Sequence, residues 1–118
     1  MKILVVDDDK RLANIIKEVF EYNGFKVVTS NDGEDAINKI NVENNFDLVI
    51  TDIKMPKKSG FEMVKELREE GNLIPVIFLT GNSNIITKER AIQSGVNEYI
   101  TKPIDFSELI ERIKEYEK

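Results

Sequence analysis

The chain contains 118 residues, of which 41% are hydrophobic and 33% are charged. This length and composition fit one folded domain, residues 1–118, and exclude a disordered chain. The chain has no Cys and no His, which excludes disulfides, thiolate chemistry, histidine-ligated metal sites and Ser-His or Cys-His catalysis.

The charge balance restricts the partners. The chain has 17 Lys and Arg residues against 22 Asp and Glu residues, a formal net charge of −5. An acidic domain lacks the positive field that drives binding to the phosphate backbone, so we expect no direct nucleic-acid binding. No apolar run approaches the ~20 residues of a membrane span. We therefore expect no membrane association and a cytoplasmic location.

The period of the apolar residues changes repeatedly along the chain. Residues 3–6 form a continuous apolar run, which is typical of a strand buried on both faces. Residues 12–20 follow with apolar side chains at helical spacing, and Asn23-Gly24 ends this helix. The same alternation predicts strands at 27–29, 48–50, 76–79 and 99–101, and helices at 36–40, 61–67, 83–94 and 106–113. The apolar stripe of the helix at 83–94 is the least regular.

Five strand–helix repeats with apolar strands predict an α/β domain with a parallel sheet. Right-handed crossovers place helices on both faces of such a doubly wound sheet. Ligands of these folds bind beyond the carboxyl ends of the strands, where the strand order reverses. The residues that follow the strands are therefore the candidate site residues.

Polar side chains follow four of the five predicted strands. The four segments are Asp7-Asp8-Asp9, Thr51-Asp52, Thr80-Gly81 and Thr101-Lys102-Pro103. Each segment alone has a structural explanation, because Asp is a good helix cap and Thr is common in strands. Because the fold brings these strand ends together, the joint pattern indicates a functional site.

Three of these residues, Asp7, Asp8 and Asp52, would place carboxylates close together. Two unit charges about 4 Å apart repel by roughly 4 kcal/mol at an effective dielectric near 20, so the cluster requires cations. Lys102 supplies one, and Mg²⁺ (or Mn²⁺), which prefers oxygen ligands, supplies another. An all-oxygen site with a lysine and a spare carboxylate suits phosphoryl transfer to that carboxylate.

Four stretches of the chain carry a family resemblance. They are Val5-Val6-Asp7-Asp8, residues 47–56 with Gly60 beyond them, Leu79-Thr80, and residues 99–103. With these motifs, the chain resembles the receiver domain of two-component response regulators over essentially its whole length. The resemblance implies a flavodoxin-like (βα)5 domain with a parallel sheet of strand order 2-1-3-4-5.

The resemblance also implies roles at the acidic site. Asp52 is the expected phospho-acceptor, and Lys102 is the expected phosphate-binding lysine. Asp7, Asp8 and Asp52, together with the backbone carbonyl of Lys54, are expected to hold Mg²⁺. The side chains of Lys54 and Asn82 are then placed to flank the phosphoryl group and to affect its hydrolysis.

The resemblance further implies a conformational switch. Thr80 is the expected switch hydroxyl and Tyr99 the switch aromatic, and a cis peptide is expected before Pro103. Phosphorylation is expected to remodel the face formed by the helix at 83–94, the last strand and the last helix.

The implied partners are a sensor histidine kinase or a histidine phosphotransfer protein. Arg11, Asn14 and the loop at 103–105 are candidate contacts for this partner. The output would be a downstream protein, a C-terminal effector domain or a phosphorylation-dependent homodimer. The chain is not expected to be an enzyme beyond self-catalysed phosphotransfer and slow autodephosphorylation. Its end after the last helix suits a stand-alone receiver or a cut just before an effector domain.

Three alternatives remain open. Asp7-Asp8-Asp9 also fits a haloacid-dehalogenase-like phosphatase with Asp7 as the nucleophile, in which the phosphate would be on Asp7 and not on Asp52. A dinucleotide-binding fragment is disfavoured, because the first turn has acids and no Gly-x-Gly-x-x-Gly. A degenerate receiver that serves only as a scaffold is disfavoured by the intact site. Asn31-Asp32-Gly33 is interpreted as a turn and helix start.

Overall fold

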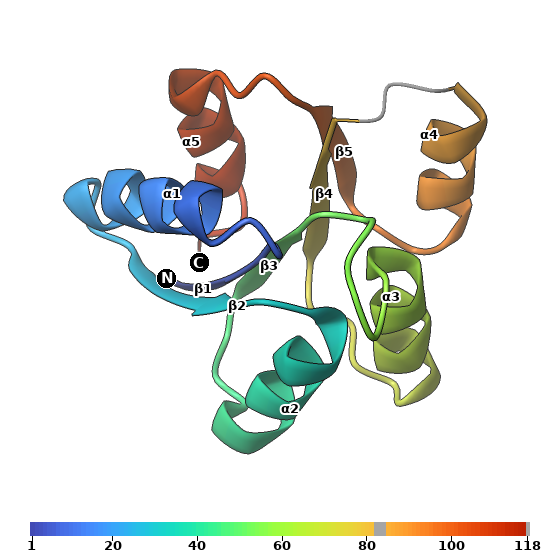
Figure 1. Cartoon of the computed structure of the whole chain (residues 1–118). Coiled ribbons are helices and arrows are strands. Elements are labelled where there is room, and N and C mark those ends of the chain that lie inside the picture. The colour runs from blue at the N-terminus through green and yellow to red at the C-terminus, as the bar shows by residue number, and fades with distance from the viewer. Residues whose placement is uncertain (82–84, 118) are drawn as a thin grey trace.

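The computed structural model describes residues 1–81 and 85–117, with the backbone alone at 85 and 86. Strands and helices alternate from one end to the other (Figure 1). The strands are β1 (Lys2–Val6), β2 (Lys26–Ser30), β3 (Leu48–Thr51), β4 (Val76–Thr80) and β5 (Glu98–Thr101). The helices are α1 (Lys10–Tyr22), α2 (Gly33–Glu43), α3 (Gly60–Glu69), α4 (Ile85–Gln93) and α5 (Phe106–Lys114). All ten predicted elements are confirmed, although the predicted start of the fourth helix at 83 lies outside the described residues.

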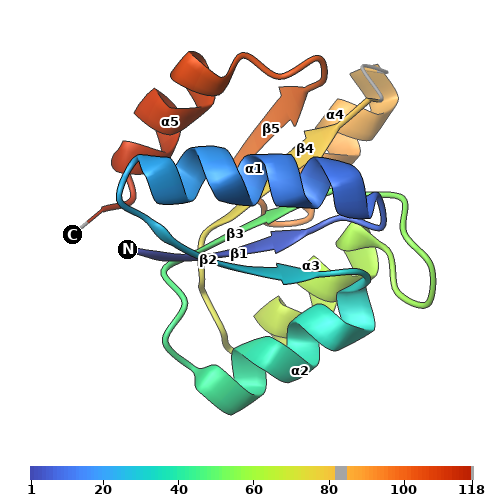
Figure 2. The ribbon, with the colours of Figure 1, turned by 60° about the vertical axis from the view of Figure 1, so that its left-hand side comes forward.

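The five strands form one parallel sheet of order β2-β1-β3-β4-β5, as predicted. All arrows point the same way in Figure 2, so the carboxyl ends of the strands share one edge. The order reverses at β1, which pairs with β2 on one side and β3 on the other. The ends of β1 and β3 therefore lie side by side at the position where this fold binds ligands.

The helices cover the sheet in two layers, each with its own hydrophobic core. Helices α1 and α5 pack on one face, and α2, α3 and α4 pack on the other (Figure 1). Alternate residues of β1 serve the two cores, with Ile3 and Val5 on the α1 side and Leu4 and Val6 on the α2 side. Because both faces are covered, residues 3–6, 48–50 and 76–79 of the three central strands are all apolar, as the continuous runs in the sequence indicated.

Two apolar residues of the predicted helices are exposed to solvent. Ile15 in α1 is 43% exposed and Ile92 in α4 is 61% exposed, whereas their neighbours Ile16 and Ala91 are buried. The stripe on α1 is wider than the area that the sheet and α5 cover, so its edge faces solvent. No helix in the described part of the chain is long and apolar enough to cross a membrane.

Candidate functional site

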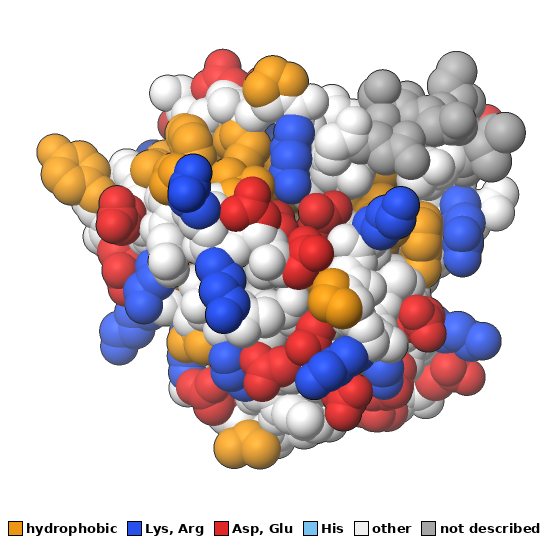
Figure 3. All heavy atoms as spheres, in the orientation of Figure 1, with side chains coloured by type: hydrophobic (Ala, Val, Ile, Leu, Met, Phe, Trp, Pro, Cys, Tyr) orange, Lys and Arg blue, Asp and Glu red, His pale blue; other side chains and the backbone are white. Residues whose placement is uncertain are grey.

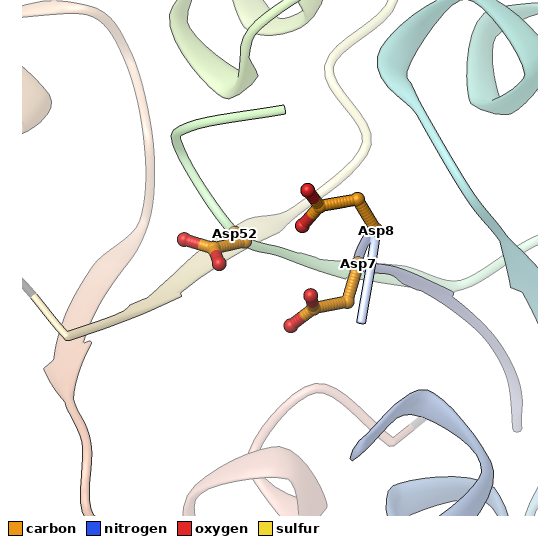
Figure 4. Close-up of side chains that lie close together, drawn as sticks. All are labelled: Asp7, Asp8 and Asp52. Carbon is orange, nitrogen blue, oxygen red and sulfur yellow. The ribbon is translucent and has the colours of Figure 1, made fainter. Parts of the chain in front are cut away.

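The carboxyl edge of the sheet carries a concentrated acidic patch. Figure 3 shows Asp and Glu side chains at the centre of one face, Lys and Arg side chains around them, and apolar side chains over α1 and α5. Asp7 and Asp8, which follow β1, and Asp52, which follows β3, lie at this edge of the sheet. One carboxylate oxygen from each residue lies within 4.8 Å of the other two. The three carboxylates face a common space (Figure 4).

Asp7 is the buried member of the cluster, at 3% exposed. Its backbone N–H donates to the Ser30 carbonyl at the end of β2 (3.0 Å), and its Oδ1 accepts the Asp9 N–H (2.9 Å). Burial raises the pKa of the Asp7 carboxyl above its ordinary value, although the Asp9 N–H and the Lys102 ammonium oppose this shift. The charged form of Asp7 is therefore costly, and a cation in the pocket would stabilise it.

Lys102 bridges two of the three acids. Its Nζ lies 3.4 Å from Asp7 Oδ2 and 3.3 Å from Asp52 Oδ2. Burial lowers the pKa of this ammonium, but the carboxylates of Asp7 and Asp52 outweigh it, so the net pKa of Lys102 is raised. The Lys102–Pro103 peptide is cis, as expected, and the Lys102 N–H donates to the Thr80 carbonyl (2.8 Å). The ammonium therefore stays charged, and the main chain that carries it is tied to the end of β4.

One carboxylate oxygen of Asp52 faces the pocket, and the other accepts a hydrogen bond from the backbone. Its Oδ1 accepts the N–H of Ile53 (2.7 Å), while its Oδ2 faces Lys102. The backbone behind it is closely packed, because a Cβ on Gly60 would lie 2.6 Å from the Asp52 carbonyl oxygen and 3.0 Å from the Ile53 Cα. Only a glycine at position 60 allows α3 to start this close to the end of β3.

The two expected switch residues lie on neighbouring strands next to the site. Thr80 is the last residue of β4 and is buried, and it stands opposite Thr101 in the register of β4 and β5. Tyr99 stands opposite Phe78 and packs, partly buried, against the core on the α2–α4 side. Burial raises the pKa of the Tyr99 phenol, so it remains neutral. Thr80 is thus beside the acidic pocket, and Tyr99 is two residues further from it.

The remaining sequence-predicted residues surround this pocket. Lys54 is exposed on the loop after Asp52, and Arg11 and Asn14 are exposed on the first turns of α1. Asn82 lies outside the described residues. Sequence reasoning missed the contribution of Asp9, which caps α1 through the Arg11 and Leu12 N–H groups while its own N–H fixes Asp7. The preference of helix N-termini for Asp was the signal that pointed to it.

A divalent metal ion fits this pocket on chemical grounds. The donors of Asp7, Asp8 and Asp52 are all oxygens, and exposed Asp8 leaves the pocket open to water. Mg²⁺ is bound through one or two carboxylates while it keeps several waters, so it suits a half-open cluster of this kind. Lys102 lies between the carboxylates of Asp7 and Asp52 and already neutralises part of their negative charge.

An apolar groove adjoins the acidic pocket. It has a volume of about 260 Å³ and is lined by Leu12, Ile15, Lys102, Pro103, Ile104 and Phe106. These residues come from the first turns of α1 and from the β5–α5 connection. Since Lys102 also contacts Asp7 and Asp52, the groove and the acidic pocket share one wall.

The chain is a flavodoxin-like doubly wound domain with an acidic pocket where the strand order reverses. It matches the family described as "Response regulator receiver domain" over residues 3–114, and it belongs to that family. It is a receiver domain of two-component signalling, a phosphorylatable switch and not a metabolic enzyme.

Relatives and solved structures agree with this assignment. The chain is similar to the transcriptional regulatory protein CpxR of Escherichia coli (strain K12), with 37% identity over 113 residues, covering 96% of this chain and 47% of CpxR. It resembles the Francisella response regulator 1452 receiver domain at 38% identity and a TM-score of 0.92, covering 98% of this chain and 94% of that one. It also resembles response regulator TrrA of Thermotoga maritima in complex with Mg²⁺-BeF, at 35% identity and a TM-score of 0.86, covering 98% and 97% of the two chains.

The family assignment decides between a receiver domain and the haloacid-dehalogenase-like phosphatase. The first acidic triplet belongs to a receiver domain, and nothing supports the haloacid-dehalogenase interpretation. The chain spans about half the length of the curated relatives it matches.

Proposed function

We propose that Asp52 accepts a phosphoryl group from a sensor histidine kinase or a histidine phosphotransfer protein. The observation that carries this proposal is the position of Asp52 Oδ2, which faces Lys102 Nζ at 3.3 Å inside the three-carboxylate pocket. Asp7 is a poorer acceptor, because its side chain is buried, whereas that of Asp52 is partly exposed. Incubation with acetyl phosphate and Mg²⁺ should add the mass of one phosphoryl group, and peptide mapping should place it on Asp52.

The transfer forms one bond to phosphorus and breaks another. A carboxylate oxygen of Asp52 forms a new bond to phosphorus, and the bond between phosphorus and the donor nitrogen or oxygen breaks. Lys102 is placed to pair with phosphoryl oxygens, since its ammonium already lies between the carboxylates of Asp7 and Asp52. Asp7, Asp8, Asp52 and the Lys54 carbonyl are the proposed holders of Mg²⁺ (or Mn²⁺), which supplies charge neutralisation when bound.

Mg²⁺ should stabilise the unphosphorylated domain at low ionic strength. A ligand that binds only the folded state adds about 2.7 kcal/mol at a hundredfold excess over its dissociation constant. Asp8→Ala should remain folded, because it relieves charge repulsion, but its melting temperature should no longer respond to Mg²⁺. Asp9→Asn retains a cap and lies outside the carboxylate cluster, so it should respond as the unsubstituted protein does. A melting temperature that ignores Mg²⁺ in the unsubstituted protein would contradict the metal site.

The Lys54 side chain should prolong the life of the acyl phosphate. It is exposed two residues beyond the acceptor, where an ammonium can pair with phosphoryl oxygens or obstruct the hydrolytic water. Lys54→Ala should therefore shorten the phosphoprotein half-life several-fold, measured as loss of the phosphoryl mass after donor removal. Lys65→Ala, an exposed lysine on α3, is the matched control. Equal decay of the Lys54 variant and its control would refute this role.

Thr80 is proposed to couple phosphorylation to the α4–β5–α5 face. A phosphoryl group on Asp52 offers new acceptor oxygens. Asp52 follows β3, and Thr80 is the last residue of β4, which pairs with β3. A turn of its hydroxyl toward the phosphate frees space that Tyr99 can enter. Among the described side chains of α4, Ala91 alone is buried, so this helix is weakly anchored and can shift at low cost.

Thr80→Ala should preserve phosphorylation of Asp52 and lose its distant effect. In the unsubstituted protein, beryllofluoride with Mg²⁺ should shift backbone amide resonances in α4, β5 and α5. In Thr80→Ala, the shifts should stay within the loops around Asp7, Asp52 and Lys102. Thr101→Ala removes the exposed hydroxyl that stands opposite Thr80 in the register, and it should behave as the unsubstituted protein does. Distant shifts of equal size in the Thr80 variant would reject the coupling.

The apolar groove beside the pocket is proposed to receive the phosphodonor protein. The exposed edge of Ile15, together with Ile104 and Phe106, offers apolar area next to the acceptor carboxylate. Arg11 and Asn14, which are exposed on the same helix as Ile15, are proposed as further polar contacts. The remodelled face would then act on a downstream protein, a C-terminal effector domain or a second copy of the chain. A cytoplasmic location fits such partners and is part of the proposal.

A further inference from the structure

The first residue of α2 makes an unusually close backbone contact with the loop that follows Asp52. The Gly33 N–H donates to the Lys58 carbonyl at 3.2 Å. A Cβ placed on Gly33 would lie 2.5 Å from that oxygen and 3.1 Å from both the carbonyl carbon and the Cβ of Lys58. Real Cβ atoms do not approach backbone atoms this closely, so a side chain at position 33 would push the loop away from α2.

The residues that precede Gly33 are held in place by hydrogen bonds. Asp32 is buried and caps α2 by accepting the Asp35 N–H (2.8 Å). The Ser30 hydroxyl donates to the Asp35 carboxylate in the first turn of α2 (2.5 Å), and the Ser30 carbonyl accepts the Asp7 N–H (3.0 Å). The start of α2 is thereby tied to the same residue that forms the buried wall of the acidic pocket.

The loop on the other side of the contact, residues 52–59, is tightly closed. The Gly60 N–H donates to the Ile53 carbonyl and the Lys58 N–H to the Pro56 carbonyl, both at 2.7 Å. Lys57 adopts a positive φ of 65°, which few residues with a side chain do. Because these bonds leave the loop few ways to adapt, a displacement at Lys58 should reach Lys54, four residues earlier.

We propose that Gly33 is a positioning residue that seats this loop against α2 and so sets the place of the Lys54 carbonyl relative to the carboxylates of Asp7 and Asp8. The inference rests on the proposed function, in which that carbonyl is a metal ligand. In this arrangement α2 does more than cover the sheet, since its amino terminus determines how well the pocket holds a cation. Asn31-Asp32-Gly33 is a turn and helix start, as predicted, and in this proposal it also positions the loop that follows Asp52.

The competing effect of helix propensity makes Gly33→Ala a sharp test. The φ of Gly33 is not in the left-handed region, and Ala is a better helix former than Gly, so propensity alone predicts a variant at least as good as the original. If the contact between Gly33 and Lys58 positions the loop, its loss should raise the Mg²⁺ dissociation constant about tenfold, as when a group that orients a metal ligand is lost. Calorimetric titration with MgCl₂ measures this constant. Asn38→Ala, an exposed site on α2, should bind as the unsubstituted protein does.

A metal-free measurement accompanies the titration. In Gly33→Ala, the amide at position 33 should exchange its hydrogen faster without Mg²⁺, because its bond to the Lys58 carbonyl is lost. If Gly33→Ala does not fold, Asp32→Ala and Asp32→Asn replace it. Both remove the same charge, but only Asn keeps an oxygen to cap α2, so the Ala variant should bind Mg²⁺ more weakly than the Asn variant.

The outcomes separate this inference from the proposed function. If the unsubstituted protein does not bind Mg²⁺, the proposed metal site fails. If it binds and Asp8→Ala does not, but Gly33→Ala binds with an unchanged constant, the metal site stands and the role of Gly33 is overturned. Equal constants for the two Asp32 variants would overturn it in the same way.

Discussion

Asp52→Asn should abolish phosphorylation by acetyl phosphate. The variant keeps an oxygen to accept the Ile53 N–H, which Asp52 Oδ1 accepts at 2.7 Å, so the backbone after β3 should not change. It loses the anionic oxygen that faces Lys102 at 3.3 Å and that would attack phosphorus. It also removes one of three clustered charges, so the fold should not suffer. Intact-mass analysis after incubation with the donor and Mg²⁺ should show no added phosphoryl group.

The control for this experiment is the neighbouring acid that lies outside the cluster. Asp9→Asn keeps a side chain that can cap α1 and should be labelled to the same extent as the unsubstituted protein. Undiminished labelling of Asp52→Asn, with the phosphate mapped to Asp7, would contradict the assignment of the acceptor.

Phe78→Ala should cause the largest loss of stability. Phe78 is fully buried in β4, and its ring meets the Phe61 ring edge-on at a centroid distance of 5.3 Å. A Cβ on Gly60 would lie 3.2 Å from the same ring, and Tyr99 stands opposite it on β5. Removal of a buried Phe costs about 3–5 kcal/mol in the free energy of unfolding. For a domain of this size, this corresponds to a melting temperature lower by roughly 12–20 °C.

Replacing an aromatic residue by alanine away from the core should have almost no effect on stability. Tyr22 at the end of α1 is 92% exposed, and Tyr22→Ala should change the free energy of unfolding by no more than about 0.5 kcal/mol. Phe78→Leu keeps most of the buried volume and should cost less than about 1.5 kcal/mol. Urea unfolding followed by circular dichroism measures all three variants. A loss for Phe78→Ala as small as that for Tyr22→Ala would show that the space beneath Phe61 refills.

The arrangement of the strands was readable because apolar periodicity reports burial directly. Residues 3–6 and 76–79 are apolar throughout because helices cover both faces of β1 and β4. Exposure at the edges of the helices was not readable. Ile15 belongs to the α1 stripe, yet it faces the groove beside Pro103, because the space above α1 depends on where the β5–α5 connection lies.

The clustering of the site was readable for a different reason. In a parallel sheet whose order reverses at β1, the residues after β1 and β3 must be neighbours, so the sequence alone was enough to place Asp7, Asp8 and Asp52 together. Lys102 could be added because its strand ends at the same edge. The difference in burial between Asp7 and Asp8 could not be predicted from the sequence. Asp7 is buried and Asp8 is exposed because of the way α1 and the loops cover the edge of the sheet.

The sequence by itself determined the elements, the parallel sheet and the chemical nature of the pocket, because these follow from local periodicity and from residues adjacent to strand ends. Tertiary structure alone decided which oxygen of Asp52 faces Lys102, which acid is buried, and that Gly33 touches the Lys58 carbonyl. Gly33 and Lys58 are 25 positions apart in a chain that offers no periodic signal for their contact. Contacts of that kind arise from the packing of whole elements, and packing is fixed only when every side chain between them has found its place.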